Sequence, residues 1–181
     1  WDKLFGKSIK VLRKFSQFLL ITDGDTSILD SLKGKVKVLV QRCLWHIPYQ
    51  AKYVLWQDGV KHKSAEWLHV ISELMEICAI RPLVDCEKTI KKMIESKRKR
   101  LESVIQYCLS KGYTHTASYL ENAMPDMFTA IEKRLKGKTT SKVERVMRTI
   151  NMRVNVSKWS IAGALNVTKI RLAYYYNGFD A

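Results

Sequence analysis

Residues 18–46 read FLLITDGDTSILDSLKGKVKVLVQRCLWH, and they set the architecture that the sequence predicts. The continuous apolar run at 18–22 is typical of a strand buried on both faces, and it stops at the turn-forming residues 23–25. A short helix and a second, β-branched strand at 36–40 follow. A strand-helix-strand unit usually forms a parallel pair with a right-handed crossover, so we expect Asp23 at the ligand-binding edge of a sheet.

From Cys43 onward the sequence predicts helices almost throughout, so the fold class is mostly α with a small β component. Apolar spacing, caps and helix breakers locate these helices. The first is an amphipathic helix marked by Leu68, Ile71, Met75 and Cys78 and broken by Pro82, and the second is a long basic helix with an apolar stripe at Leu101, Val104, Ile105 and Cys108. Two short helices follow around Pro125. The chain then forms a helix capped by Thr139, Thr140 and Ser141, and a last helix around Ile161, Leu165 and Leu172.

Composition narrows the class of protein. The 181 residues are 46% hydrophobic, which allows a sizeable core and argues against disorder. The net charge of +15 favours a polyanionic partner, and nucleic acid is a simpler choice than an anionic membrane. We find no apolar run of about 18 residues, as a membrane span requires, and no signal peptide at the first residues. The sequence therefore predicts an intracellular protein with reduced cysteines.

Two carboxylates are candidates for chemistry. Asp23 at a strand end can bind a divalent ion, although an Asp-Gly-Asp sequence also favours a plain turn in which Asp25 caps the next helix. Glu144 falls in the first turn of a predicted helix, where the helix dipole and a pair with Arg148 would also explain it. Local pattern alone leaves both alternatives open.

The spacing Cys43-x-x-His46 resembles half of a zinc site. A structural zinc site needs four ligands, and the other histidines and cysteines are scattered along predicted helices. A small buried thiol and a hydrogen-bonded histidine explain the pair more simply.

Basic residues concentrate at 91–100 and at 145–153. Like charges three or four residues apart on a helix repel, and they are tolerated more readily where phosphates neutralise them. A solvated helix face is the alternative explanation. The five Trp residues and the Tyr174–Tyr176 run could stack on bases, but aromatic residues at helical spacing are usually part of a core. The predicted DNA-binding residues are Lys91, Lys92, Lys97, Arg98, Lys99, Arg100, Arg145, Arg148 and Arg153.

Taken together, these motifs resemble the Mutator-type insertion-sequence transposases of bacteria and archaea. An Asp-Gly at 23–24 is followed by Gln-Arg-Cys-x-x-His at 41–46, as in that family. The segment 139–148, with Glu144 after a Thr/Ser cluster and before arginines, looks like the family's last motif. The resemblance covers most of the chain from Asp23 to Asn177 and is weakest in the helical middle.

The resemblance implies a ribonuclease-H-like α/β core with an all-helical insertion, and an Asp, Asp, Glu site that binds two Mg²⁺ (or Mn²⁺) ions. Asp23 would be the second acidic residue and Glu144 the third, while Cys43 and His46 would support the site structurally. Residues 1–58 would form part of the core, 59–138 the helical insertion and 139–181 the C-terminal helices of the core. Two metal ions held in this way catalyse cleavage and joining of DNA.

The first acidic residue of the family's site has no counterpart here, because it would precede the position of Trp1. We therefore expect a truncated core that is inactive alone. The implied partners are transposon ends and target DNA, without a membrane; the implied location is the cytoplasm, at the nucleoid; homo-oligomerisation of the complete protein is left open. The alternatives are a non-catalytic helical nucleic-acid-binding module, a ribonuclease-H-like nuclease without strand transfer, and a purely structural interaction protein.

Overall fold

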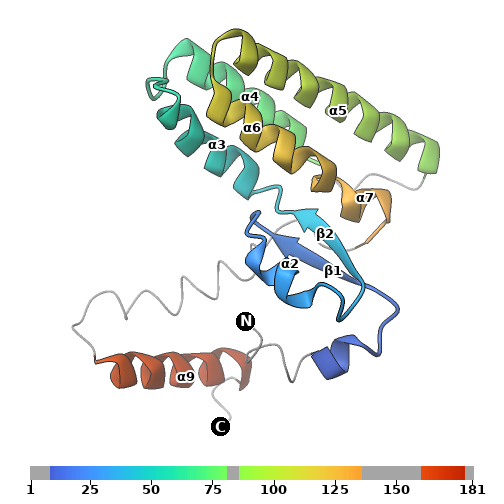
Figure 1. Ribbon diagram of the computed structural model, residues 1–181, viewed down its shortest axis with the longest axis vertical. Coiled ribbons are helices and arrows are strands. Elements are labelled where there is room, and N and C mark those ends of the chain that lie inside the picture. Colours follow the sequence, from blue (N-terminus) through green and yellow to red (C-terminus); the bar gives the residue numbers. More distant parts are fainter. Residues whose placement is uncertain (1–8, 81–85, 136–159, 178–181) are drawn as a thin grey trace. The chain divides into compact units, whose positions relative to one another are not determined.

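The structure is a computed structural model, and it describes residues 9–80, 86–135 and 160–177 (Figure 1). The chain divides into two compact units, Trp1–Thr139 and Thr140–Ala181. As predicted, the described residues are mostly helical with a small parallel sheet. The elements are β1 (Phe18–Thr22), α2 (Ser27–Leu32), β2 (Val38–Arg42), α3 (His46–Gln57), α4 (Ala65–Cys78), α5 (Glu87–Ser110), α6 (Thr114–Ala123), the 3-10 helix η1 (Met124–Asp126), α7 (Thr129–Glu132) and α9 (Ile161–Asn177).

Strands β1 and β2 pair in parallel, with α2 between them in the chain, which confirms the predicted strand-helix-strand unit. The register runs from Phe18 opposite Val38 to Thr22 opposite Arg42. The prediction of the second strand at 36–40 was therefore two residues too early. Its last two residues are polar, so a search for β-branched and apolar residues could not include them.

The expectation that the first strand is buried on both faces was wrong for the described residues. Only Thr22 of β1 is buried, and the four residues before it are half-buried. The sheet described here has two strands, so each strand has a neighbour on one side only. Leu32 of α2, which is 1% exposed, supplies a buried apolar side chain to this unit.

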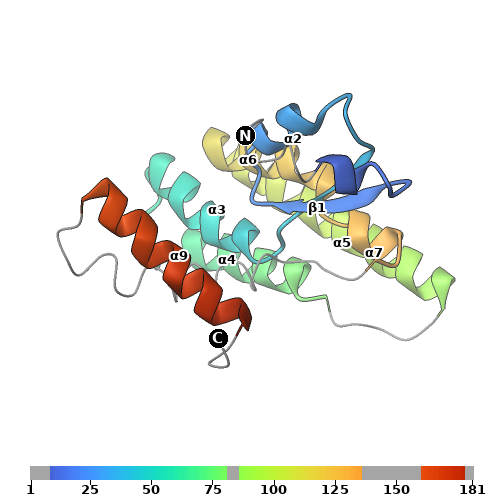
Figure 2. The same ribbon diagram turned by 90° about the horizontal axis from the view of Figure 1, so that it is seen from below.

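Helices α3, α4, α5 and α6 form a bundle in which α3 contacts α4 and α6, and α5 contacts the same two helices (Figures 1 and 2). The predicted apolar stripe of α5 is buried in this bundle, which confirms it. The bundle and the sheet belong to one compact unit, and the division of the chain at residue 58 stays a prediction. The fully buried large side chains in the bundle core include Ile47, Leu55, Leu74, Ile77, Leu101, Leu120, Met127 and Phe128.

The predicted face of α4 was partly wrong. Leu68 and Met75 are 52% and 58% exposed, whereas Trp67, Val70 and Leu74 are buried. This helix has apolar residues on more than one face, and periodicity alone cannot decide which of them meets a partner.

Asp58 connects the end of α3 to the beginning of α6. Its carboxylate accepts hydrogen bonds from the N–H groups of His115 (2.9 Å) and Thr116 (2.8 Å) and from the Thr116 hydroxyl (2.7 Å). The first N–H groups of a helix have no partner within the helix, so this carboxylate caps α6 from a distant part of the chain.

Helix α9 belongs to the second unit, and it agrees with the predicted last helix. Its Ile161, Leu165 and Ile170 are 85%, 56% and 68% exposed. Among the helices described, none combines the length and the apolar character needed to cross a bilayer.

We predict that Asp58→Ala lowers the free energy of unfolding by about 2 kcal/mol, because it removes the cap of α6 and leaves a buried hydroxyl short of a partner. Urea denaturation followed by circular dichroism measures this change. Asp30→Ala, an exposed carboxylate in α2, is the matched control and should change stability by less than about 0.5 kcal/mol. Equal effects of the two substitutions would show that the cap contributes little.

Candidate functional site at the end of the first strand

Asp23 follows β1 directly, at the carboxyl end of the parallel pair, and its side chain is exposed. Its Oδ1 accepts hydrogen bonds from the Asp25 N–H (3.2 Å) and from the Thr22 hydroxyl (3.4 Å). The carboxylate faces an open pocket of about 800 Å³, which we call the acid pocket. Its lining residues are Asp23, Gly24, Asp25, Thr26, Arg42, His46, Tyr49, Gln50, Tyr119, Asn122 and Asp126.

Asp25 lies in the same pocket but is engaged locally. Its Oδ1 accepts a hydrogen bond from the Ser27 N–H at 2.8 Å, at the start of α2. Hydrogen bonds from the Ser27 side chain and backbone lower the pKa of this carboxyl. This contact belongs to a local turn before α2, whose N-cap residue is Thr26. A metal-binding role for Asp25 stays a prediction.

Arg42, the last residue of β2, joins the Asp23 turn to the helical bundle. Its Nη1 donates to the Asp23 carbonyl and its Nη2 donates to the Asn122 carbonyl in α6, both at 3.2 Å. Gly24 has φ +119°, and a Cβ at this position would lie 1.5 Å from Arg42 Nη1. Glycine is therefore required twice, by the backbone conformation and by the approach of the guanidinium group.

Gln41 makes a second connection between the sheet and the bundle, and it is completely buried. Its Nε2 donates to the Met127 carbonyl (2.6 Å) and its Oε1 accepts from the Ala130 N–H (2.8 Å). One amide thus satisfies a donor and an acceptor in the α7 region, more than 80 residues away in the chain. A buried polar group that is fully paired in this way fixes one arrangement of the two parts.

Cys43 and His46 occupy the junction between β2 and α3. The Cys43 N–H donates to the Thr22 carbonyl at 2.8 Å, which continues the pairing beyond the last strand residue, and its side chain is completely buried. His46 begins α3 and lines the acid pocket, and its N–H donates to the Cys43 carbonyl at 3.1 Å. These positions agree with structural support, and that role stays a prediction. Within residues 9–80, 86–135 and 160–177, no three His, Cys, Asp or Glu side chains form a group suited to a metal ion.

Reasoning from the sequence missed the residues that α6 and η1 bring to the acid pocket. Asp126 is half-buried, and desolvation raises the pKa of its carboxyl, against the opposing effect of Arg42. Burial raises the pKa of Tyr119 to about 12, so its hydroxyl keeps its proton at neutral pH. No local motif marks these residues, because they reach Asp23 only through the packing of a bundle that follows in the chain.

Several predicted site residues lie outside the described residues. They are Glu144, Arg145, Arg148 and Arg153, together with the cap at 139–141 and the turn at 136–138. Whether Glu144 approaches Asp23 therefore stays a prediction.

Four of the six basic residues predicted to bind DNA on α5 form ion pairs with carboxylates of the same chain. Ion pairs form between Lys91 and Glu87, Arg98 and Glu132, Lys99 and Glu95, and Arg100 and Glu73, and the Lys97 ammonium donates to the Glu76 carbonyl. Desolvation lowers the pKa of Lys97. Intramolecular pairing explains the clustering of charge without phosphates, so DNA contact at this helix stays a prediction.

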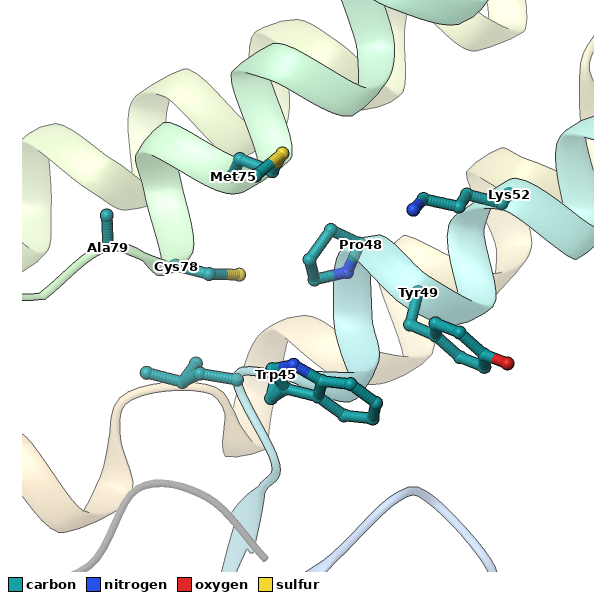
Figure 3. Close-up of a pocket in the computed structure, with 8 residues that line it drawn as sticks. Trp45, Pro48, Tyr49, Lys52, Met75, Cys78 and Ala79 are labelled. Carbon is teal, nitrogen blue, oxygen red and sulfur yellow. The ribbon is translucent and has the colours of Figure 1, made fainter. Parts of the chain in front are cut away.

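A second pocket, apolar and about 360 Å³ in volume, lies between α3 and α4 (Figure 3). Trp45, Pro48 and Tyr49 face Met75 and Cys78 across it. Burial raises the pKa of the Cys78 thiol to about 12, so this sulfur is a neutral, apolar wall and not a nucleophile at neutral pH. Among the described residues, Lys52 is the charged residue that lines this pocket.

Comparison of the chain with protein-family models, with curated proteins and with solved structures gives no match. The geometry defines the candidate site: a carboxylate follows a parallel strand, and two connections, through Gln41 and Arg42, join the sheet to a helical bundle.

We predict that Gln41→Leu lowers the free energy of unfolding by about 2–4 kcal/mol, because it leaves the Met127 carbonyl and the Ala130 N–H buried without partners. Denaturation by urea measures the loss. Gln106→Leu, at an exposed position of α5, is the control and should be close to neutral. If Gln41→Leu is as stable as the control, the connection through this amide is not important for the fold.

Proposed function

We propose that this chain is part of a DNA transposase of the cation-dependent, three-carboxylate type, with a ribonuclease-H-like core and Asp23 as one of its metal ligands. The observation that supports this most is the position of Asp23. It is an exposed carboxylate at the carboxyl end of a parallel strand, facing a pocket that is open to solvent. Ligands of α/β proteins bind at this edge of a sheet.

The acid pocket contains oxygen donors of the kind that a hard divalent cation such as Mg²⁺ or Mn²⁺ prefers, although no three carboxylates of the described residues converge on one point. Asp23, Asp25 and Asp126 all line it, and carboxylate oxygens completed by water are the ligands that Mg²⁺ prefers. Asp23 would bind the cation, and Glu144 is the proposed second ligand. A bound cation would supply activation of the attacking oxygen and stabilisation of the leaving oxygen at phosphorus.

Arg42 has a positioning role in this proposal. Its hydrogen bond to the Asp23 carbonyl holds the turn, and its contact with Asn122 connects that turn to α6. The helical bundle would thus hold the carboxylate at a fixed place before DNA or metal arrives, which reduces the cost of organising the site. His46 and Tyr49 extend the wall of the pocket along α3.

The net charge of +15 supports DNA as the substrate. The same charge is also compatible with a nucleic-acid-binding module that carries out no chemistry. Substitution of the carboxylates separates the two functions, because a binding module would not depend on them.

The first test concerns metal binding. Fe²⁺ takes the place of Mg²⁺ in the protein, and ascorbate with peroxide then cleaves the backbone next to the bound ion. We expect cleavage near residues 22–25 and near 141–146, and loss of both from Asp23→Asn. Asp30→Asn removes an equal charge from α2 and should leave the cleavage pattern unchanged. Cleavage at neither segment of the unsubstituted protein would refute a shared metal site.

The second test concerns the reaction. The complete parent protein, which is expected to supply the first acidic residue, is incubated with Mn²⁺ and with DNA fragments that span both flanks of its coding sequence, and broken and joined products are separated by electrophoresis. We expect Asp23→Asn and Glu144→Gln to reduce the products to the level seen without cation, while DNA affinity stays within about twofold. Equal product from the unsubstituted and the substituted proteins would favour the non-catalytic module. Cleavage without joining would favour a nuclease.

A further inference from the structure

Helix α3 carries a row of exposed aromatic side chains, which we call the aromatic stripe. Trp45, Tyr49, Tyr53 and Trp56 are 48%, 58%, 52% and 68% exposed. Their spacing of four, four and three residues places them on one face of the helix. Large aromatic groups are normally buried, so a continuous exposed row of them indicates a binding surface.

The rings of the stripe are organised as two neighbouring pairs. Trp45 and Tyr49 are stacked, with centroids 5.2 Å apart and planes 15° apart. Tyr53 and Trp56 lie with centroids 5.7 Å apart and planes 31° apart. Aromatic side chains have few rotatable bonds, so a flat ligand can stack on them at a small cost in entropy.

The charge around the stripe suits a polyanion. Residues 46–57 contain no Asp or Glu, and Lys52 lies on the same face between Tyr49 and Tyr53. The apolar pocket beside the stripe is lined by Lys52 and by no carboxylate from the part of the chain that the structure describes. The acid pocket is different, because its three aspartates would repel a phosphate in the absence of a cation.

The stripe leads into the acid pocket. Tyr49 lines both pockets, and His46, one turn before it on α3, lines the acid pocket with Asp23. Figure 3 shows the Trp45 and Tyr49 rings side by side at the edge of the apolar pocket. A ligand along the stripe would therefore reach the carboxylates at the end of β1.

We propose that the aromatic stripe binds single-stranded DNA, by stacking of its bases, and leads that strand to the acid pocket. The rings supply stacking surfaces that accept any base, and Lys52 neutralises a phosphate. Within a duplex the flat faces of the bases are covered by stacking on the neighbouring base pairs, so the stripe selects single strands, whose bases can unstack. The destination of the strand rests on the proposed function, whereas the stacking surface itself requires neither metal nor Asp23.

The experiment measures the affinity of the protein for a fluorescently labelled single-stranded oligothymidine in EDTA, by anisotropy. We expect Trp45→Ala and Trp56→Ala each to weaken binding by about tenfold, which is the effect of losing one stacked base. Phe15→Ala removes an aromatic side chain of similar exposure, 61%, away from α3, and it should bind as the unsubstituted protein does. Thermal unfolding by circular dichroism checks that all three variants are folded.

Two further ligands test the chemistry of recognition. An abasic strand of the same length keeps the phosphates and loses the bases, and we expect it to bind at least tenfold more weakly than oligothymidine. A duplex of equal length should bind with an affinity that Trp45→Ala and Trp56→Ala do not change. Equal binding of abasic and normal strands would overturn the proposal, as would Trp variants that bind like Phe15→Ala.

A protein partner is the competing use of such a surface. If the unsubstituted protein has no affinity for the strand and instead self-associates on gel filtration, with Trp56→Ala monomeric, the stripe is a contact between proteins and the proposal is wrong. The test is independent of the metal site. If the unsubstituted protein shows Fe²⁺ cleavage near 22–25 but does not bind the strand, only this inference is wrong. If it binds the strand but shows no such cleavage, only the proposed function is wrong.

Discussion

The fold described here depends on the buried amide of Gln41. It is the point at which a small parallel sheet, whose apolar side chains are only half-buried, is joined to a helical bundle that has a full core. A two-stranded unit is marginal by itself, and this one gains its stability from attachment. Because the amide hydrogen-bonds the Met127 carbonyl and the Ala130 N–H, far along the chain, as well as the neighbouring Arg42 carbonyl, it favours one arrangement of sheet and bundle over others.

Arg42 extends that arrangement to the candidate site. The guanidinium hydrogen-bonds the turn after β1 and the end of α6. A shift of α6 would therefore move the turn that carries Asp23. Gln41 and Arg42 are adjacent in a strand, where successive side chains point to opposite faces. The Gln41 side chain therefore points toward the α7 region, while the Arg42 side chain lines the acid pocket. The Cys43 backbone then continues the strand pairing toward α3.

The two faces of α3 lie in different environments. Its buried face, with Ile47, Ala51 and Leu55, belongs to the bundle core. The opposite face exposes aromatic rings next to the acid pocket. In the basic helix α5, by contrast, four basic side chains form intramolecular ion pairs, with carboxylates of α4, of α7 and of α5 itself. Among the described residues, the aromatic face of α3 is therefore the surface that we propose for a single strand, in place of the basic helix α5.

The sequence by itself determined the local structure: the strand that ends just before Asp23, the parallel unit, the long helix with its buried stripe, and the turn at residues 23–25. Each of these depends on periodicity or on hydrogen bonds between near neighbours, which a linear pattern records. Only the tertiary structure decided the true end of β2, the buried face of α4, the exposure of the aromatic stripe and the arrival of Asp126 and Tyr119 beside Asp23. Those features depend on which helices and strands pack against each other, and a linear pattern does not record this. Gln41 is an example: a polar residue is tolerated in a strand here because its hydrogen-bond partners Met127 and Ala130 come from far along the chain.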